Sequence, residues 1–227
     1  MSSEGGALAA VRSLEAVAAA GGMETLSEQE RTEAMAAACS VLLCGIGEDT
    51  GREGLVKTPM RMARALLELT RGYKADAGSI LSGALFEVDG GGGVVVVKDI
   101  EFSSLCEHHV LPFFGSVHIG YLPGARVVGL SKLARVVAVF AARLQVQERL
   151  TRQVAEAVLE HVGAKGVVVM VEAEHMCMGM RGARKPGSST VTMVRLGAFL
   201  EDESLMDEFR MQMGLRGGGG RASGRGR

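Results

Sequence analysis

Two groups of strand-like segments flank a pair of amphipathic helices in the middle of this 227-residue chain, and this order most constrains its fold. Apolar runs bounded by turn residues predict four strands, over Val94–Ile100, Gly115–Leu122, Gly166–Ala173 and Ser188–Leu196. Between the two pairs, apolar residues at a 3.6-residue spacing predict a helix capped by Ser131 and a second over Gln147–Val162. Strands and helices do not alternate as they would in βαβ units. The sequence therefore predicts an α+β domain rather than a doubly wound parallel sheet.

Further helices are predicted on both sides of this centre. One covers Thr25–Leu43, and another opens at Thr58-Pro59 with Thr58 as its N-cap and ends at Gly72. A last short helix covers Asp202–Met213. We therefore expect a flexible leader over residues 1–24, one domain over 25–213 and a disordered Arg/Gly tail over 214–227.

The composition narrows the class of partner. Lys and Arg number 25 against 26 Asp and Glu, a net charge of −1 that argues against a nucleic-acid partner. No apolar run approaches the roughly 18 residues of a membrane span, so no membrane partner is expected. Four cysteines are too few for a disulfide scaffold of this length, which favours a reducing, cytoplasmic location. Cys39 and Cys44 are expected to be core residues.

A candidate metal site is the densest chemical signal. Cys106 and His109 have the spacing that lets two side chains reach one ion from a tight turn, and Cys177 supplies a distant third ligand. Two thiolates and one imidazole leave a fourth position for water, which is typical of catalytic zinc. The alternative is that these residues are simply buried. His108 and His175 flank the ligands as candidate proton carriers, whereas His118 and His161 are expected to be solvated or structural.

A second signal points to an anion. Cations stand at two helix starts and after the third candidate ligand, where a polyphosphate would offset their charge; they are Arg61, Arg64, Lys132, Arg135 and Arg181. No G-x-x-x-x-G-K-[ST] loop accompanies them. Each group taken alone is equally typical of a solvated surface.

Five segments in this order, CEHH, GLSKLAR, QVQERLT, EAEHMCMGMRG and RKPGSSTVT, resemble type I GTP cyclohydrolase, from about Gly54 to Phe199. The resemblance implies the T-fold, a four-stranded antiparallel sheet packed with helices. Five subunits would close their sheets into a barrel, and two rings would stack as a homodecamer with active sites between subunits. Arg64 is a small departure from the Lys of many bacterial members.

The resemblance also implies hydrolysis of GTP to 7,8-dihydroneopterin triphosphate and formate, the first step towards tetrahydrofolate or tetrahydrobiopterin. Cys106, His109 and Cys177 would hold Zn²⁺, which activates a water for attack on C8 of guanine. His108 would protonate N7, and His175 with Ser131 would serve the opening of the ribose and the later rearrangement. Glu148 with Gln147 would bind guanine. The triphosphate contacts would be Arg61, Arg64, Lys132, Arg135 and Arg181.

Three alternatives have distinct marks in the sequence. A nitrile reductase of the same fold would place its catalytic cysteine differently and lack CEHH. A cyclohydrolase that does not use zinc would lack Cys106, and a regulatory subunit would have lost a ligand or a proton donor. None of these marks is present. The pathway that uses the product, binding of a feedback regulatory protein, organelle targeting and the roles of the leader and tail stay open.

Overall fold

The computed structural model describes residues 19, 21, 26–88 and 92–215. The chain divides into two compact units, with the division after Thr70. The predicted leader and tail lie almost wholly outside the described residues, as do residues 89–91. Among the described residues, no helix is both long and apolar enough to cross a membrane.

In the described part of the first unit, helix α2 (Glu28–Gly45) packs against helix α3 (Thr58–Leu69). Helix α2 starts later than predicted because the Ser27 side chain and Glu30 form a reciprocal capping box. The prediction that Thr58 caps α3 is wrong, because Lys57 is the N-cap and the Thr58 hydroxyl bonds to Gly54 O within the preceding turn.

Two further predictions fail around these helices. Cys39 is buried, but Cys44 is exposed near the end of α2 and is not a core residue. Helix α3 ends at Leu69 and not at Gly72, which belongs to the second unit. A Cβ on Gly72 would lie 2.0 Å from Val139 O, so this glycine is explained by close backbone packing and not by helix termination.

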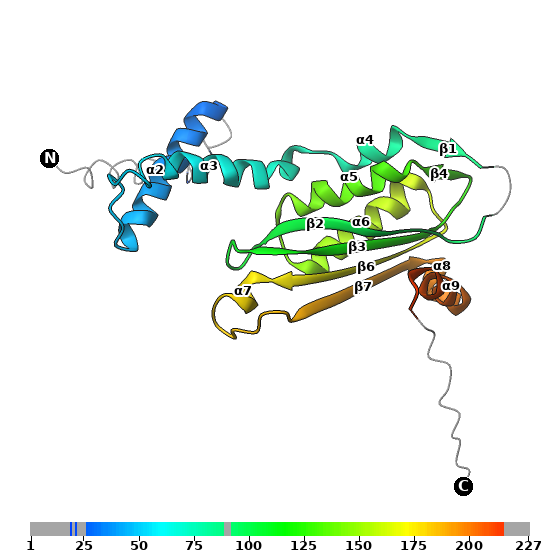
Figure 1. The fold of residues 1–227 in the computed structure, drawn as a ribbon. Helices are drawn as coiled ribbons and strands as arrows, with labels where there is room; N and C mark the ends of the chain where they lie inside the picture. Colours follow the sequence, from blue (N-terminus) through cyan, green and yellow to red (C-terminus); the bar gives the residue numbers. More distant parts are fainter. Residues whose placement is uncertain (1–18, 20, 22–25, 89–91, 216–227) are drawn as a thin grey trace, which may run out of the picture. The chain divides into compact units, whose positions relative to one another are not determined.

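The second unit is built on a five-stranded sheet in the order β5-β2-β3-β6-β7 (Figure 1). Its long strands are mutually antiparallel: β2 (Val95–Cys106), β3 (Pro112–Leu122), β6 (Gly166–His175) and β7 (Ser189–Gly197). The short β5 (Leu144–Gln145) adds a parallel pair at the free edge of β2. The α+β prediction is confirmed, and all four predicted strands exist, with β2 and β3 longer than expected.

Helices α5 (Leu130–Ala141) and α6 (Gln147–Val162) cover one face of this sheet. Their apolar stripes bury Leu133, Val137, Leu150 and Val154 against Val117 and its strand neighbours in the main core. Helix α6 has the predicted bounds, and Gly163 follows it as a C-cap in the left-handed conformation. Ser131, predicted as the N-cap of α5, instead lies inside the helix, because Gly129 takes the cap position.

The other face of the sheet carries a smaller core near the start of β6. Helices α8 (Ala198–Glu201) and α9 (Glu203–Met213) bury Phe199, Met206 and Phe209 against Val168 and Met170. The last predicted helix is therefore confirmed, with Asp202 as its N-cap.

Several short elements lie before β2 and between β3 and α5. A 3-10 turn η2 (Arg71–Lys74) precedes α4 (Ala77–Ser82), and β1 (Leu85–Glu87) pairs with β4 (Arg126–Val128). Gly129 N–H also bonds to Ala84 O, so the start of α5 lies beside β1, at the end of the sheet where β3 finishes.

Candidate functional site

The three candidate metal ligands meet at one end of the sheet because of strand pairing. Cys106 is the last residue of β2, and His109 lies in the turn that leads into β3. Phe113, near the start of β3, pairs with His175 at the end of β6. Cys177 follows two residues later in the single-turn helix α7 (Met176–Gly179). Residues about 70 positions apart are thus brought to one place, as predicted.

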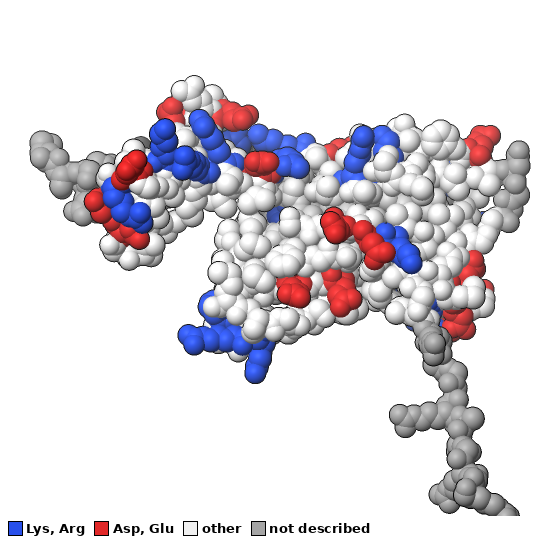
Figure 2. All heavy atoms as spheres, viewed as in Figure 1, with Lys and Arg blue, Asp and Glu red and all other residues white. Residues whose placement is uncertain are grey.

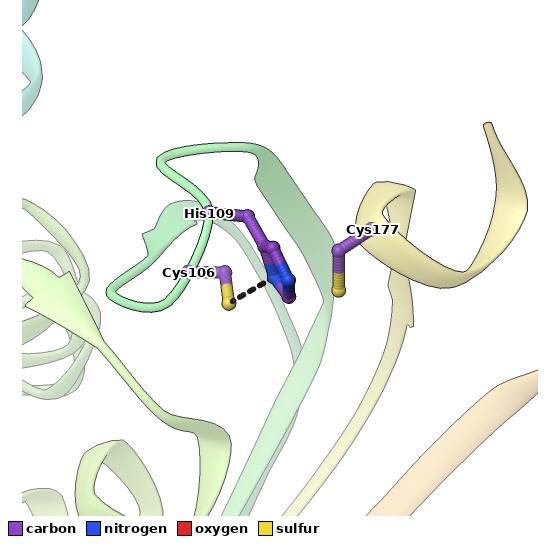
Figure 3. A group of neighbouring side chains, drawn as sticks. All are labelled: Cys106, His109 and Cys177. Carbon is purple, nitrogen blue, oxygen red and sulfur yellow. Dashed lines mark hydrogen bonds between the residues drawn. The ribbon is translucent and has the colours of Figure 1, made fainter. Parts of the chain in front are cut away.

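The ligand atoms of this triad all lie within 4.8 Å of one another (Figure 3). Cys106 Sγ is 3.8 Å from His109 Nδ1. A tetrahedral zinc ion bound to one sulfur and one nitrogen would hold them about 3.6 Å apart. Cys106 is buried, Cys177 is half-buried and His109 is exposed. A site closed on the sulfur side and open on the imidazole side can hold a metal and still admit a further ligand.

The turn that carries His109 is tightly held. Cys106 O accepts hydrogen bonds from both His109 N and Val110 N, and Cys106 N donates to Leu111 O. Val110 adopts φ +53°, a left-handed conformation that is costly for a β-branched residue. The turn therefore keeps a strained backbone next to the candidate ligand.

The two thiols influence each other electrostatically. Burial raises the pKa of Cys177, and the neighbouring Cys106 raises it further, while Arg181 acts in the opposite direction. Two sulfurs this close favour the protonated thiol unless a cation lies between them, and a metal ion supplies that cation.

His108 lies beside the triad and is largely exposed. Its Nδ1 is 3.9 Å from Cys106 Sγ, and its Nε2 is 3.9 Å from the Glu107 carboxylate. Glu107 accepts two hydrogen bonds from Arg149, and this partnership lowers the pKa of Glu107. Sequence reasoning assigned no role to this ion pair, although Glu107 lies inside CEHH and Arg149 directly follows Glu148. The pair joins the β2–β3 turn to the first turn of α6.

His175 is held in the same region by buried neighbours. Its ring is stacked on Phe113 with a centroid distance of 4.7 Å, and its Nε2 is 2.8 Å from Gln147 Oε1. Burial lowers the pKa of His175, and the nearby carboxylate of Glu148 partly offsets that effect. Glu148 itself is exposed. Both side-chain polar atoms of Gln147 form hydrogen bonds with protein groups. Its contact with guanine stays a prediction.

The predicted phosphate contacts come from three separate parts of the chain. Arg181 is exposed and follows α7, where Figure 2 shows Lys and Arg side chains over the α7–β7 loop. Ser131, Lys132 and Arg135 lie in the first half of α5, which begins at the opposite end of the sheet. A 12-residue helix spans roughly 18 Å, so Ser131 and Lys132 are well separated from the triad. Arg61 and Arg64 are exposed on α3 in the first unit.

The other two histidines are structural. His118 is buried in β3 and accepts a backbone hydrogen bond, so it is not solvated. His161 lies in the last turn of α6 with its ring against Gly78, where a Cβ would approach to 2.8 Å.

Comparisons with known proteins show which family the chain belongs to. The profile of the family described as GTP cyclohydrolase I matches residues 35–214. A GTP cyclohydrolase 1 of Campylobacter lari is 57% identical over 164 residues, covering 72% of this chain and 86% of that protein. One from Dictyostelium discoideum is 50% identical over 184 residues, covering 81% and 79%. One from Gloeobacter violaceus is 54% identical over 172 residues, covering 76% and 80%.

Among solved structures, an archaeosine synthase QueF-like protein in the apo form aligns with a TM-score of 0.40 and 17% identity, over 48% of this chain and 98% of that chain. That similarity is too low to bear on fold or activity. The family profile and the curated relatives each cover most of the chain and agree with one another. The chain belongs to the GTP cyclohydrolase I family of hydrolases.

Proposed function

We propose that this chain catalyses the zinc-dependent hydrolysis of GTP to 7,8-dihydroneopterin triphosphate and formate. This reaction begins tetrahydrofolate or tetrahydrobiopterin synthesis. The observation that carries the proposal is the convergence of Cys106, His109 and Cys177, with His108, His175 and Glu148 at the same end of the sheet.

The donor set fits zinc. Two thiolates and an imidazole are borderline-soft ligands, which suit zinc better than the oxygen-preferring magnesium or calcium. The exposure of His109 leaves access for a fourth ligand. Cys106, His109 and Cys177 would hold the zinc ion, which would supply Lewis-acid chemistry for activating water near neutral pH.

The protein side chains supply binding and proton transfer. His108 donates a proton to N7 of guanine as the imidazole ring of the base opens, and its exposed ring is accessible to a substrate. Glu148 accepts hydrogen bonds from the guanine N1–H and 2-amino groups. His175 and Ser131 move protons during opening of the ribose and closure of the new ring.

We also propose that each active site is completed by a neighbouring subunit of a T-fold homodecamer. Ser131 and Lys132 lie in the first turn of α5, which begins at the opposite end of the sheet from the triad, so these residues would serve the triad of a neighbouring subunit, together with Arg135. Strand β7 is an edge strand with exposed Val191 and Met193, which favours pairing with another subunit. A soluble enzyme of this kind would act in the cytoplasm.

The proposal is tested by incubating the purified full-length protein with GTP and measuring formate together with the fluorescent pterin formed on oxidation. We expect both products in equal amounts, loss of activity after a chelator, and recovery with zinc. ATP is the control substrate and should give neither product. Release of formate without a pterin, or an unchanged rate after complete zinc removal, would contradict the proposal.

A further inference from the structure

The ring of His175 is fixed on two sides by buried side chains. Phe113 is fully buried, and its ring lies parallel to that of His175 within 3°. Gln147, only 1% exposed, meets the edge of the imidazole with its Oε1 2.8 Å from Nε2. Stacking fixes the plane of the ring, while the hydrogen bond fixes its rotation within that plane.

The orientation of the Gln147 amide follows from its other partners. Its Nε2 lies 3.0 Å from Val171 O and 2.9 Å from Thr190 O. Backbone carbonyl oxygens only accept hydrogen bonds, so the amide atom that faces them must be the NH₂ group. The amide oxygen must therefore be the atom that faces His175.

Neighbouring hydroxyl groups agree with this orientation. Thr151 Oγ1 donates to Gln147 O, so its proton is used there. Thr192 Oγ1 then donates to Thr151 Oγ1, 2.7 Å away. Thr192 Oγ1 keeps its lone pairs for accepting, and Gln147 Nε2 lies 3.2 Å from it. With the amide reversed, the Gln147 oxygen would instead face the carbonyl oxygens of Val171 and Thr190, with no hydrogen to bond them.

The protonation of the His175 ring follows directly. An amide oxygen only accepts, so Nε2 of His175 must carry a hydrogen. In the neutral ring the lone pair is then on Nδ1. Within the part of the chain that the structure describes, no group forms a hydrogen bond with that nitrogen.

We propose that Gln147 is a positioning residue that holds His175 as its Nε2–H tautomer and thereby makes Nδ1 the nitrogen that exchanges protons with the substrate. The proposal rests on the function proposed above. In the reaction, Nδ1 takes one proton from an O–H or N–H group of the bound nucleotide and later returns it. Nε2–H stays bonded to Gln147 throughout. Gln147 thus acts through His175 and not through contact with guanine.

The first test measures the tautomer itself. Magic-angle-spinning NMR of the zinc-loaded, full-length protein with ¹⁵N-labelled histidine resolves protonated from unprotonated ring nitrogens. The His175 signals are assigned by their loss in His175→Asn. We expect the proton of the neutral ring on Nε2. A neutral ring with its proton on Nδ1 overturns the proposal without any substitution at Gln147.

The second test separates positioning from support of the fold. Gln147→Met keeps the side-chain length but removes the acceptor, and we expect kcat to fall about 10- to 100-fold, as for other outer-shell partners of active-site histidines, with KM changed less than about threefold. Gln145→Met is the matched control, because Gln145 is equally buried and its amide bonds to Phe140 O and Gln153 Oε1 instead. Its kcat should stay within about threefold of the parent.

A double-mutant cycle completes the test. If Gln147 acts through His175, adding Gln147→Met to His175→Asn should reduce kcat by less than about threefold. The same full loss in both backgrounds means that Gln147 only supports the fold, and it overturns the proposal. An inactive parent enzyme contradicts the proposed function, whereas an active parent with the Nδ1–H ring contradicts only the role of Gln147.

Discussion

His118 Nδ1 accepts a hydrogen bond from the backbone N–H of Asp99 across the β2–β3 pair, at 3.0 Å. Asp99 adopts φ +59° where the register of the two strands shifts between Val97 and Ile100. The buried imidazole thus satisfies the N–H of an irregular strand residue. A protonated ring would carry a hydrogen on Nδ1 and could not accept this bond.

This contact predicts an acid-sensitive contribution to stability. Burial lowers the pKa of His118; Asp99 and Glu172 partly offset this, and Lys98 adds to it. The folded pKa is therefore below the unfolded value of about 6.5. The contribution is fully present above that pH and is lost as the pH falls through the folded pKa.

The variant His118→Asn tests this prediction because its side chain keeps an acceptor that cannot titrate. As the pH falls from 7 to 5, we expect the free energy of unfolding of the variant, measured by urea titration, to increase relative to that of the parent. A constant difference would exclude His118 as the titrating group.

Removing one ligand of the triad should release the metal. Cys177→Ala leaves one thiolate and one imidazole, which cannot hold zinc tightly. Metal analysis after dialysis should show less than about one tenth of the parent's zinc, with activity lost in parallel. Cys44→Ala is the control, because Cys44 is exposed on α2 and far along the chain from the triad. Full zinc occupancy in the Cys177 variant would remove that residue from the site.

His108 should be separable from metal binding. His108→Ala is expected to retain zinc and the fold but to lose on the order of 10²-fold in pterin formation, the usual loss for a general acid. Zinc content and circular dichroism check the first expectation, and steady-state rates check the second. A rate near that of the parent would make His108 merely an exposed residue of the turn.

The cations should recognise the triphosphate and not the base. Lys132→Ala and Arg181→Ala each remove a charge-assisted hydrogen bond, so binding of GTP should weaken about 10-fold or more. Binding of guanosine, measured by the same calorimetric titration, should change little. Lys165→Ala removes an exposed cation elsewhere and is the control. Equal losses for both ligands would mean that the two residues act through folding or assembly.

Glu148 should select guanine over adenine. Its carboxylate can accept from N1–H and the 2-amino group, whereas adenine offers an acceptor at N1 and no 2-amino group. Glu148→Gln turns one acceptor into a donor, so GTP should bind about 10²-fold more weakly while zinc and the fold persist. Glu156→Gln on the same helix is the control, since Glu156 pairs with Arg152 at the surface. Unchanged affinity in the Glu148 variant would make Glu148 only a helix-start charge.

The parts of this fold that depend on local pattern could be predicted from the sequence. The helix that ends at Gly163 was predicted correctly, because its apolar period and its glycine stop are both local signals. Helix starts were less accurate. Thr58 and Ser131 are common capping residues, but at both sites the chain enters the helix earlier, and the cap position falls to Lys57 and Gly129.

In the candidate site, too, the features that depend on a local sequence pattern could be predicted, and those that depend on long-range pairing could not. The ligand spacing of Cys106 and His109 is visible in the sequence, and the contribution of Cys177 could be inferred because few residue types bind zinc. The pairing of Glu107 with Arg149 could not be inferred, because it depends on where α6 begins relative to the β2–β3 turn. The hydrogen bonds of Gln147 with Val171 O and Thr190 O could not be inferred either, because they depend on the register of β6 and β7. The register between strands that are far apart in the sequence cannot be read from a local motif.

The candidate metal ligands come from the end of β2, from the turn before β3 and from the helix after β6, and this arrangement has a consequence for biosynthesis. During translation, Cys106 and His109 leave the ribosome well before Cys177. A nascent chain at that point offers two ligands and retains no ion. Only after β6 has paired with β3 does the third sulfur reach its place, so an ion bound by all three residues would be captured late. A chain truncated before Cys177 would lack the third ligand, and metal content would therefore report that β6 has paired with β3, before β7 is added at the edge.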